Sequence, residues 1–201
     1  MLKIKKIAVT GGLAAGKTTV CRLFKELGAY VVNADEIVHQ LLSPGTAVGQ
    51  QVVSLLGSDI ISGQGLDRKK IAAKVFSQPD LLLALEEIIH PAVFDEIEQK
   101  YQQIEREKKY SLFLAEIPLL YETEGEGRFD AVISVLADPA LCRKRFMQQT
   151  REPVQEFEKR MTRQIEPILK ANKAHYTIEN NGDLEELKTK IKTLYFQLTE
   201  E

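Results

Sequence analysis

The segment KIAVTGGLAAGKTTV, residues 6–20, decides how the rest of the sequence can be interpreted. It begins within the stretch Ile4–Val9, which predicts a short buried strand, and it ends in the apolar face of a predicted helix. Between them, Gly11, Gly16, Lys17 and Thr18 have the G-x-x-x-x-G-K-[ST] spacing of a phosphate-binding loop. That spacing carries weight only between a strand and a helix, and both flanks are present. The sequence therefore predicts a nucleotide-binding loop in preference to a turn that only connects two elements.

The residue types of this loop suit phosphate groups. Glycines let the backbone curl so that N–H groups point at phosphate oxygens, and the following helix adds the positive end of its dipole. We expect Lys17 to reach the β- and γ-phosphates and the Thr18 hydroxyl to ligate Mg²⁺.

Further strands follow from other apolar runs. Ala29–Val32 comes directly after the first helix, which Gly28 ends, so the chain opens as strand, turn, helix, strand, the beginning of a parallel sheet. Later runs are continuously apolar or β-branched, as in strands covered by helices on both faces. They are Tyr110–Ile117, Phe129–Ala137 and His175–Asn180. We therefore predict an α/β fold with a parallel sheet of about five strands.

About 80 residues separate the second and third predicted strands, too many for an unstructured crossover. Their pattern predicts a helical insertion broken at SPG, GQG, QP and HP, and in the last break we expect His90 to end one helix and Pro91 to start the next. A second stretch, Arg143–Lys173, is also helical in pattern but strongly charged, which favours a segment that can move. The helices predicted in the insertion are Glu36–Leu42, Ala47–Leu56, Arg68–Phe76, Asp80–Ile89 and Pro91–Glu107.

The composition excludes several classes of function. The chain of 201 residues holds 27 basic and 29 acidic residues, and its formal charge of −2 gives no overall attraction to nucleic acid or to an anionic membrane. Its 2 cysteines provide neither a disulfide framework nor a clustered metal motif. The apolar run Leu112–Tyr121 is far shorter than the ~20 residues of a membrane helix. We expect a cytoplasmic protein with no nucleic-acid, membrane or obligatory protein partner.

Asp35 is a candidate catalytic residue because it follows the second predicted strand. The C-terminal ends of parallel strands share one edge of a sheet, so this carboxylate should lie on the side of the phosphate loop. There it could orient an attacking hydroxyl and accept its proton during phosphoryl transfer. Asp35 would suit the N-cap of the following helix equally well, and its spacing leaves both roles open.

Other charged and polar residues offer contacts for phosphates, a base or a metal. Glu116 and Glu122 flank the end of the third predicted strand, where a metal-bound carboxylate could sit and a capping or surface role is equally plausible. The segment Glu179–Gly182 ends the last predicted strand, and it could line an adenine pocket as well as form a turn. Clustered arginines that could neutralise phosphates, although each alone is ordinarily a solvated residue, are Arg68, Arg143, Arg145, Arg151, Arg160 and Arg163.

A phosphate loop by itself does not separate a kinase from a GTPase, a motor or an ATP-binding regulator. The GTPase motifs are missing, because no N-K-x-D is present and no D-x-x-G follows the third predicted strand. From about Ile7 to about Leu187, however, the sequence resembles the dephospho-coenzyme A (dephospho-CoA) kinase family. The resemblance is carried by VTGGLAAGKTTV, LGAYVVNADEIVHQLLSPGT, LDRKKIAAKVF, HP, IPLLYE, RKRF and ENNG. Among P-loop kinases, the pairing of ADEI with LSPG and HP is highly specific to this family.

The resemblance implies a reaction and a division of the chain. The reaction is transfer of the ATP γ-phosphate to the 3′-hydroxyl of dephospho-CoA, giving CoA and ADP, with Mg²⁺. The implied P-loop core comprises residues 1–35, 108–140 and 174–201, with a helical acceptor-binding region at 36–107 and a helical lid at 141–173.

The resemblance also assigns site residues one by one. It makes Lys17, Asp35 and Arg145 catalytic, with Asp35 as the base and Arg145 facing the phosphates from the lid. It places Asp35 and Arg68 on the acceptor substrate and Thr18 on the metal. The implied ATP-binding residues are Gly11, Gly12, Ala14, Ala15, Gly16, Lys17, Thr18, Thr19 and Asn181.

Two departures from the family pattern lie in functional segments. The family usually has Gly-Ser where this chain has Ala14-Ala15, and the loop can demand a backbone angle at residue 14 that glycine adopts most easily. A second lid arginine is usual where Gln149 stands, and Arg151 is a candidate to compensate. Two other functions stay open: a P-loop kinase for a nucleoside or similar alcohol, and an ATP-binding regulatory module without transferase activity.

Overall fold

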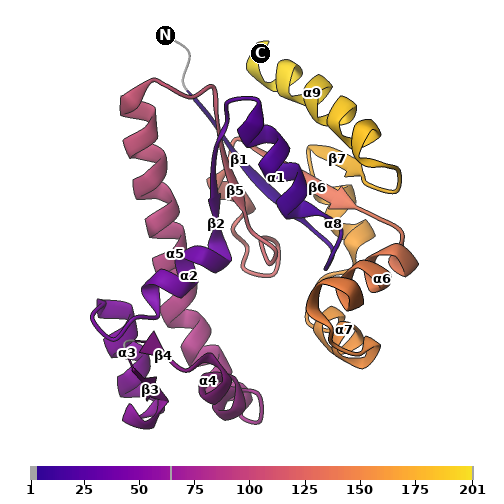
Figure 1. The fold of residues 1–201 in the computed structure, drawn as a ribbon. Helices are drawn as coiled ribbons and strands as arrows, with labels where there is room; N and C mark the ends of the chain where they lie inside the picture. The colour runs from indigo at the N-terminus through magenta and orange to yellow at the C-terminus, as the bar shows by residue number, and fades with distance from the viewer. Residues whose placement is uncertain (1–3, 64, 201) are drawn as a thin grey trace. The chain divides into compact units, whose positions relative to one another are not determined.

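The computed structural model describes residues 4–63 and 65–200 (Figure 1). The chain divides into two compact units. The first unit comprises Met1–Asn33 and Tyr101–Glu201, and the second unit comprises Ala34–Lys100.

The first unit is built on a five-stranded parallel sheet with the strand order β2-β5-β1-β6-β7 (Figure 1). At its centre, Ile7 of β1 is paired with Leu114 on one side and Ala131 on the other. All five strands run the same way, so their C-terminal ends share one edge of the sheet, which confirms the predicted α/β class. The strands are β1 (Lys5–Gly11), β2 (Tyr30–Asn33), β5 (Leu112–Glu116), β6 (Ala131–Leu136) and β7 (Tyr176–Glu179).

Helices flank this sheet and close its core. The first helix, α1, packs against the C-terminal helix α9, while α8 packs against β1 and β6. The buried core between them includes Phe24, Leu112, Ile133, Phe146 and Ile191. The predicted helical stretch 143–173 is helical, in three pieces. The helices of this unit are α1 (Lys17–Glu26), α6 (Pro139–Thr150), α7 (Val154–Met161), α8 (Pro167–Lys173) and α9 (Leu184–Glu200), with a short 3₁₀ turn at Glu126–Arg128.

The second unit is mainly helical and has its own apolar cluster, which includes Val52, Ile60 and Leu85. Two of its helices begin with side-chain caps. The Thr46 hydroxyl accepts from the backbone of Gly49, and the Asp67 carboxylate accepts from the first turn of the next helix. Its elements are α2 (Ala34–Leu41), α3 (Ala47–Leu56), the 3₁₀ turn Ser58–Ile60, β3 (Ile61–Ser62), β4 (Gly65–Leu66), α4 (Arg68–Val75) and α5 (Pro79–Glu107), whose C-terminal end belongs to the first unit.

One break in this insertion contains an element that the sequence analysis did not predict. The antiparallel pair β3 and β4 flanks the GQG break, of which Gln64 lies outside the described residues. Each strand has two residues, too few for the alternating apolar pattern that would have indicated it.

The prediction that a helix ends at His90 is wrong. Helix α5 continues through Pro91 to Glu107, because its buried positions continue on one face across the proline. Leu85 before the proline and Val93 and Ile97 after it recur at helical spacing, and all three are buried. Proline has a helical φ, so it costs a hydrogen bond without forbidding the helix, and here the continuous apolar face outweighs that cost. Although α5 has 29 residues, no helix in the described part of the chain is long and apolar enough to cross a membrane.

Replacing Pro91 by alanine should raise the free energy of unfolding by about 1–2 kcal/mol. The new N–H can donate to the carbonyl of Glu87 one turn earlier, and the exposed proline ring contributes no buried packing. Part of this gain is offset because alanine, unlike proline, leaves the unfolded chain free to adopt more conformations. Urea unfolding measures the change. Pro79→Ala is the control, since proline at the first helical position costs no hydrogen bond, and it should bring no gain. A Pro91→Ala protein less stable than the wild type would contradict the prediction.

Candidate active site

The predicted phosphate loop lies between the end of β1 at Gly11 and the start of α1 at Lys17. Gly11 and Gly16 have φ angles of 137° and 102°, which side chains rarely tolerate. A Cβ at Gly11 would also collide with the backbone of Val135, and one at Gly16 would collide with the Asn180 side chain. Glycine is therefore required at both positions for two reasons, the backbone angle and the close neighbour.

Ala14 adopts the left-handed conformation that the sequence analysis anticipated at this position, with a φ of 55°. This conformation costs alanine roughly 1 kcal/mol and costs glycine little. The neighbouring Ala15 does not have a positive φ, and its side chain is buried against the core. The loop thus retains its turn without the glycine, at the expense of local strain.

Lys17 lies over the loop that it is expected to serve. Its ammonium donates to the carbonyl oxygens of Gly12 at 2.8 Å and Gly11 at 3.3 Å, and its side chain is largely buried. No side chain caps the N-terminus of α1, so the first-turn N–H groups are not occupied by a capping residue. A lysine and an uncapped helix N-terminus at one turn form an anion-binding arrangement.

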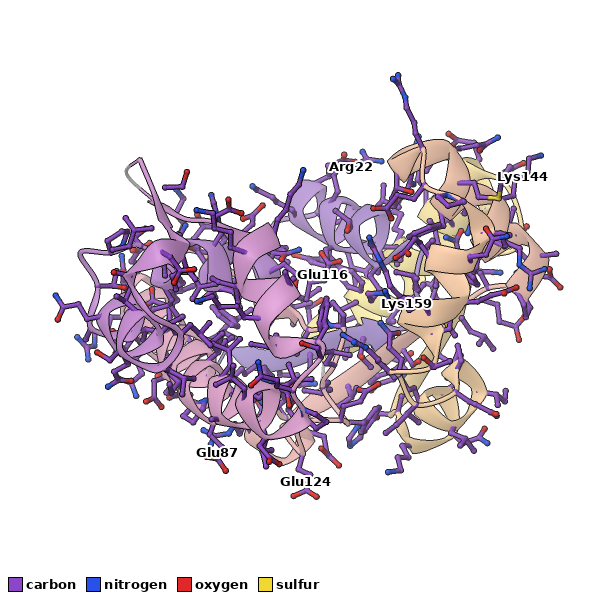
Figure 2. All side chains as sticks on the ribbon, turned by 90° about the horizontal axis from the view of Figure 1, so that it is seen from below. Arg22, Glu87, Glu116, Glu124, Lys144 and Lys159 are labelled. Atoms are coloured by element: carbon purple, nitrogen blue, oxygen red, sulfur yellow. The ribbon has the colours of Figure 1, made fainter. Side chains whose placement is uncertain are left out.

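Thr18 is connected to the ends of two neighbouring strands. Its hydroxyl donates to Glu116 Oε1 at 2.8 Å, and Asn33 Nδ2 donates to Glu116 Oε2 at 2.9 Å. Glu116 ends β5 and is 5% exposed, and Figure 2 shows it inside the fold while Lys144 extends outward from α6. Mg²⁺ is commonly held by one or two protein oxygens together with phosphate oxygens and waters. The Thr18 hydroxyl and the Glu116 carboxylate fit that donor set.

The two glutamates considered for a metal have different surroundings. Glu116 contacts the loop threonine, whereas Glu122 Oε1 lies 2.7 Å from Lys170 Nζ and accepts from the Ile165 N–H at 2.8 Å. The sequence pattern favoured neither. The register of β5 determines which glutamate lies beside the phosphate loop. It pairs Glu116, the last residue of the strand, with Val9 near the end of β1, whereas Glu122 lies further along the chain.

Arg145 is brought to the phosphate loop from α6. Its guanidinium donates to the carbonyl oxygens of Asn180 at 3.1 Å and Ala15 at 3.5 Å. The Asn180 side chain donates to the same Ala15 oxygen at 2.8 Å. Two residues thus bind the loop carbonyl at Ala15: Arg145 of α6 and Asn180, which follows β7.

Asn180 is a residue that the sequence analysis missed, since it selected Asn181 from the same ENNG motif. Asn180 is buried and touches the loop, whereas Asn181 is exposed and its side-chain oxygen accepts from the Asp138 N–H at 2.7 Å. Both follow the last residue of β7, where strand alternation no longer tells which side chain faces inward. The motif therefore predicted the segment that contacts the loop, and the role of Asn181 toward ATP stays a prediction.

The other candidate residues of the segment 141–173, for which a lid was expected, lie on the surface. Arg143 pairs with Glu158 at 3.6 Å, and Arg160 pairs with Glu152 at 2.6 Å. Arg151 ends α6 with a φ of 59°. Its expected compensation for the missing arginine stays a prediction. The exposed side chains in this group are those of Arg143, Gln149, Arg151, Arg160 and Arg163.

Asp35 and Arg68 belong to the second unit. Helix α2 begins at Ala34, so Asp35 lies within its first turn and is not the residue before the helix, as an N-cap role would require. Along the chain it follows Asn33, which binds Glu116, by two residues. Arg68 begins α4 directly after its capping residue, and both candidate side chains are exposed. Their roles toward the substrates stay predictions.

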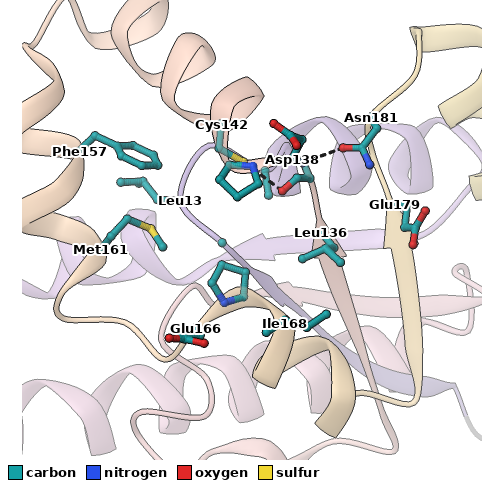
Figure 3. Close-up of a pocket in the computed structure, with 15 residues that line it drawn as sticks. Leu13, Leu136, Asp138, Cys142, Phe157, Met161, Glu166, Ile168, Glu179 and Asn181 are labelled. Carbon is teal, nitrogen blue, oxygen red and sulfur yellow. Dashed lines mark hydrogen bonds between the residues drawn. The ribbon is translucent and has the colours of Figure 1, made fainter.

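A pocket of about 490 Å³ lies beside the phosphate loop (Figure 3). Its size is typical of small-molecule sites, and most of its walls are apolar. Burial raises the pKa of the Cys142 thiol in its wall, so this group stays protonated and apolar in character. The lining residues are Gly12, Leu13, Ala15, Leu136, Ala137, Asp138, Pro139, Cys142, Phe157, Met161, Glu166, Pro167, Ile168, Glu179 and Asn181.

The parallel sheet and the loop after its central strand define a P-loop nucleotide-binding protein. A family model described as dephospho-CoA kinase matches residues 5–186. The chain belongs to the dephospho-CoA kinase family, whose members are ATP-dependent kinases, which confirms the resemblance stated above.

Individual relatives agree with this assignment. A dephospho-CoA kinase of Protochlamydia amoebophila is 50% identical over 199 residues, which is 98% of each chain. A solved structure from Thermus thermophilus is 28% identical, with a TM-score of 0.84 over 98% of this chain and 100% of that chain. The dephospho-CoA kinase from Campylobacter jejuni shares the fold with a TM-score of 0.73 at 24% identity, over 97% of each chain.

Replacing Ala14 by glycine should change the free energy of unfolding by less than about 0.5 kcal/mol, because relief of the left-handed strain offsets the added freedom of the unfolded chain. The matched variant Ala15→Gly relieves no such strain and removes a buried methyl group, so it should lose about 1–2 kcal/mol. Chemical unfolding of both variants measures this difference. Equal losses in the two would contradict the strain at Ala14.

Proposed function

We propose that this protein transfers the γ-phosphate of ATP to the 3′-hydroxyl of dephospho-CoA, producing CoA and ADP. Membership of the family over residues 5–186 supports the substrate. The observation that carries the chemistry is the phosphate loop at which Lys17, Thr18 and the buried Glu116 meet. Such a loop supports phosphoryl transfer mainly by positioning the phosphates and neutralising their charge.

ATP would occupy both the loop and the adjoining pocket. The phosphates would bind the loop and the N-terminus of α1, where Lys17 can leave its carbonyl partners for phosphate oxygens. Gly12 and Ala15 belong to the loop and also line the pocket, so one nucleotide can extend from one to the other. The apolar walls suit the faces of an adenine ring, and Asn181 at the rim provides a polar group for its edge.

Thr18 and Glu116 would hold the Mg²⁺ that accompanies ATP. When bound, this ion neutralises phosphate charge during the transfer. Asn33 fixes one oxygen of Glu116, which keeps the other oxygen directed at Thr18.

Asp35 would act on the acceptor. Its carboxylate would take the proton of the 3′-hydroxyl as the hydroxyl oxygen bonds to the γ-phosphorus and the bond to the leaving ADP oxygen breaks. Arg68 would bind the acceptor substrate. Arg145 would stabilise the charge that spreads over the transferring phosphoryl group, for which its present place on the loop carbonyl at Ala15 is a starting point.

An acceptor panel tests this function. The purified protein with ATP and Mg²⁺ is offered dephospho-CoA, nucleosides and other small alcohols, and ADP and the phosphorylated products are measured. Dephospho-CoA should be converted to CoA with a much higher kcat/KM than any other acceptor. Phosphorylation of nucleosides alone would favour a different P-loop kinase, and tight ATP binding without turnover would favour a regulatory module.

Asp35→Asn should lower kcat by about 10²- to 10⁴-fold and leave ATP affinity nearly unchanged, because only proton transfer from the acceptor is removed. Steady-state kinetics and ATP titration separate the two quantities. Glu36→Gln removes an exposed carboxylate from the same helical turn and should retain near wild-type turnover. Wild-type turnover in Asp35→Asn would reduce this residue to a structural one.

Arg145→Ala should lower kcat by about 10²- to 10³-fold and weaken ATP binding by less than about tenfold, because the contact strengthens as charge develops during transfer. Arg143→Ala is the matched control, since Arg143 lies on the same helix in an exposed ion pair. It should change neither quantity. A loss confined to ATP affinity would contradict a role for Arg145 in the transition state.

A further inference from the structure

A fully buried lysine lies in α8, outside the residues given a role so far. The Lys170 side chain in α8 has no exposed surface, and its ammonium lies 2.7 Å from Glu122 Oε1. It also donates to the Pro118 carbonyl oxygen at 2.8 Å. Lysine is rarely buried completely unless its charge is paired, so this ion pair is a specific feature of the fold.

Glu122 connects this lysine to the segment before α8. The same carboxylate oxygen accepts from the Ile165 N–H at 2.8 Å. The loop that follows β5 is therefore bound both to the connection between α7 and α8 and to α8 itself.

The opposite side of this loop is bound to the strand that carries the phosphate loop. The Pro118 carbonyl accepts from the Thr10 hydroxyl at 3.3 Å, and the Ile117 N–H donates to the Val9 carbonyl at 2.9 Å. Thr10 is fully buried and directly precedes Gly11. A short chain of polar contacts therefore runs from Lys170 through Pro118 to the start of the phosphate loop.

Helix α8 also touches the phosphate loop directly, at its other end. Pro167 begins the helix, and its ring lies so close to Gly12 that a Cβ on that glycine would be 2.9 Å from the Pro167 Cγ. Pro167 and Ile168 line the pocket proposed for the adenine ring. Lys170 follows Pro167 by less than one helical turn, so a shift of the ion pair would move this wall of the pocket.

The ion pair is not arranged for stability alone. The second carboxylate oxygen of Glu122, Oε2, is buried without a hydrogen-bond partner among the described residues, which is unfavourable. Burial lowers the pKa of Lys170, and the adjacent Glu122 carboxylate opposes that shift, so the charge of the lysine depends on its partner. Well-packed apolar residues often stabilise a fold as well as a buried ion pair does, whereas charges fix a particular geometry.

We propose that Glu122 and Lys170 form a positioning pair for ATP, which sets the place of α8 against the phosphate loop without contacting the nucleotide. The proposal rests on the proposed function only in taking ATP as the nucleotide of this site. Loss of the pair should therefore weaken the binding of ATP more than the binding of the acceptor.

The test uses Glu122→Gln, Lys170→Met and the double variant, with ATP affinity measured by calorimetry in the absence of acceptor. Near-ultraviolet circular dichroism establishes conditions under which each protein compared is folded. The double variant removes both charges at nearly constant shape, so it remains informative where a single variant leaves one buried charge unpaired and fails to fold. We expect its ATP dissociation constant to rise about tenfold, with dephospho-CoA affinity within about twofold of the wild type.

Glu152→Gln is the control because it breaks an exposed ion pair between the α6–α7 connection and Arg160 of α7. It should leave ATP affinity unchanged. The proposal is overturned if the folded double variant binds ATP within threefold of the wild type, if dephospho-CoA affinity falls as much as ATP affinity, or if the control loses as much. Turnover of dephospho-CoA by the wild-type protein tests the proposed function separately, so the two ideas fail on different measurements.

Discussion

The close approach of β6 and β7 to the phosphate loop is the constraint on which the rest of the structure depends. The backbone of Val135 lies against Gly11, and the Asn180 side chain lies against Gly16, in spaces that no Cβ can share. A loop held this tightly cannot drift when a charged ligand arrives, which is the condition for electrostatic preorganisation. The positive φ of Ala14 is tolerated because these neighbours determine the path of the loop on both sides.

The parallel sheet converts this local constraint into a site. Thr18, Glu116 and Asn33 come from three separate segments, yet two hydrogen bonds join them because β2 and β5 end at the same edge. On the other side of β1, the end of β7 supplies Asn180 to the same loop. Each contact uses a strand end as its support, so the geometry is fixed by the backbone ladder more than by flexible side chains.

Sequence patterns predicted those parts of the protein that depend on local spacing or on continuous burial. The three central strands could be predicted because strands covered on both faces are apolar almost throughout, the two edge strands because shorter apolar or β-branched stretches mark them, and the phosphate loop because its motif occupies consecutive residues. The features that local patterns could not predict depend on neighbours distant in sequence. The choice of Asn180 over Asn181 and of Glu116 over Glu122 is made by packing and register, and the passage of α5 through Pro91 by a buried face on both sides of it.

The buried ammonium of Lys170 also makes the folding equilibrium of this protein depend on pH. Its pKa is lowered in the folded state, whereas in the unfolded chain it returns to the usual lysine value of about 10.4. Between those two values the unfolded chain holds the extra proton, so a rise in pH through this window favours the folded state at this site. This pH dependence of the unfolding free energy has the opposite sign to that of a lysine whose pKa is raised by its ion pair, which loses stability in alkali. An alkaline solution therefore removes a cost at Lys170 even as it neutralises the lysine half of its pairing with Glu122.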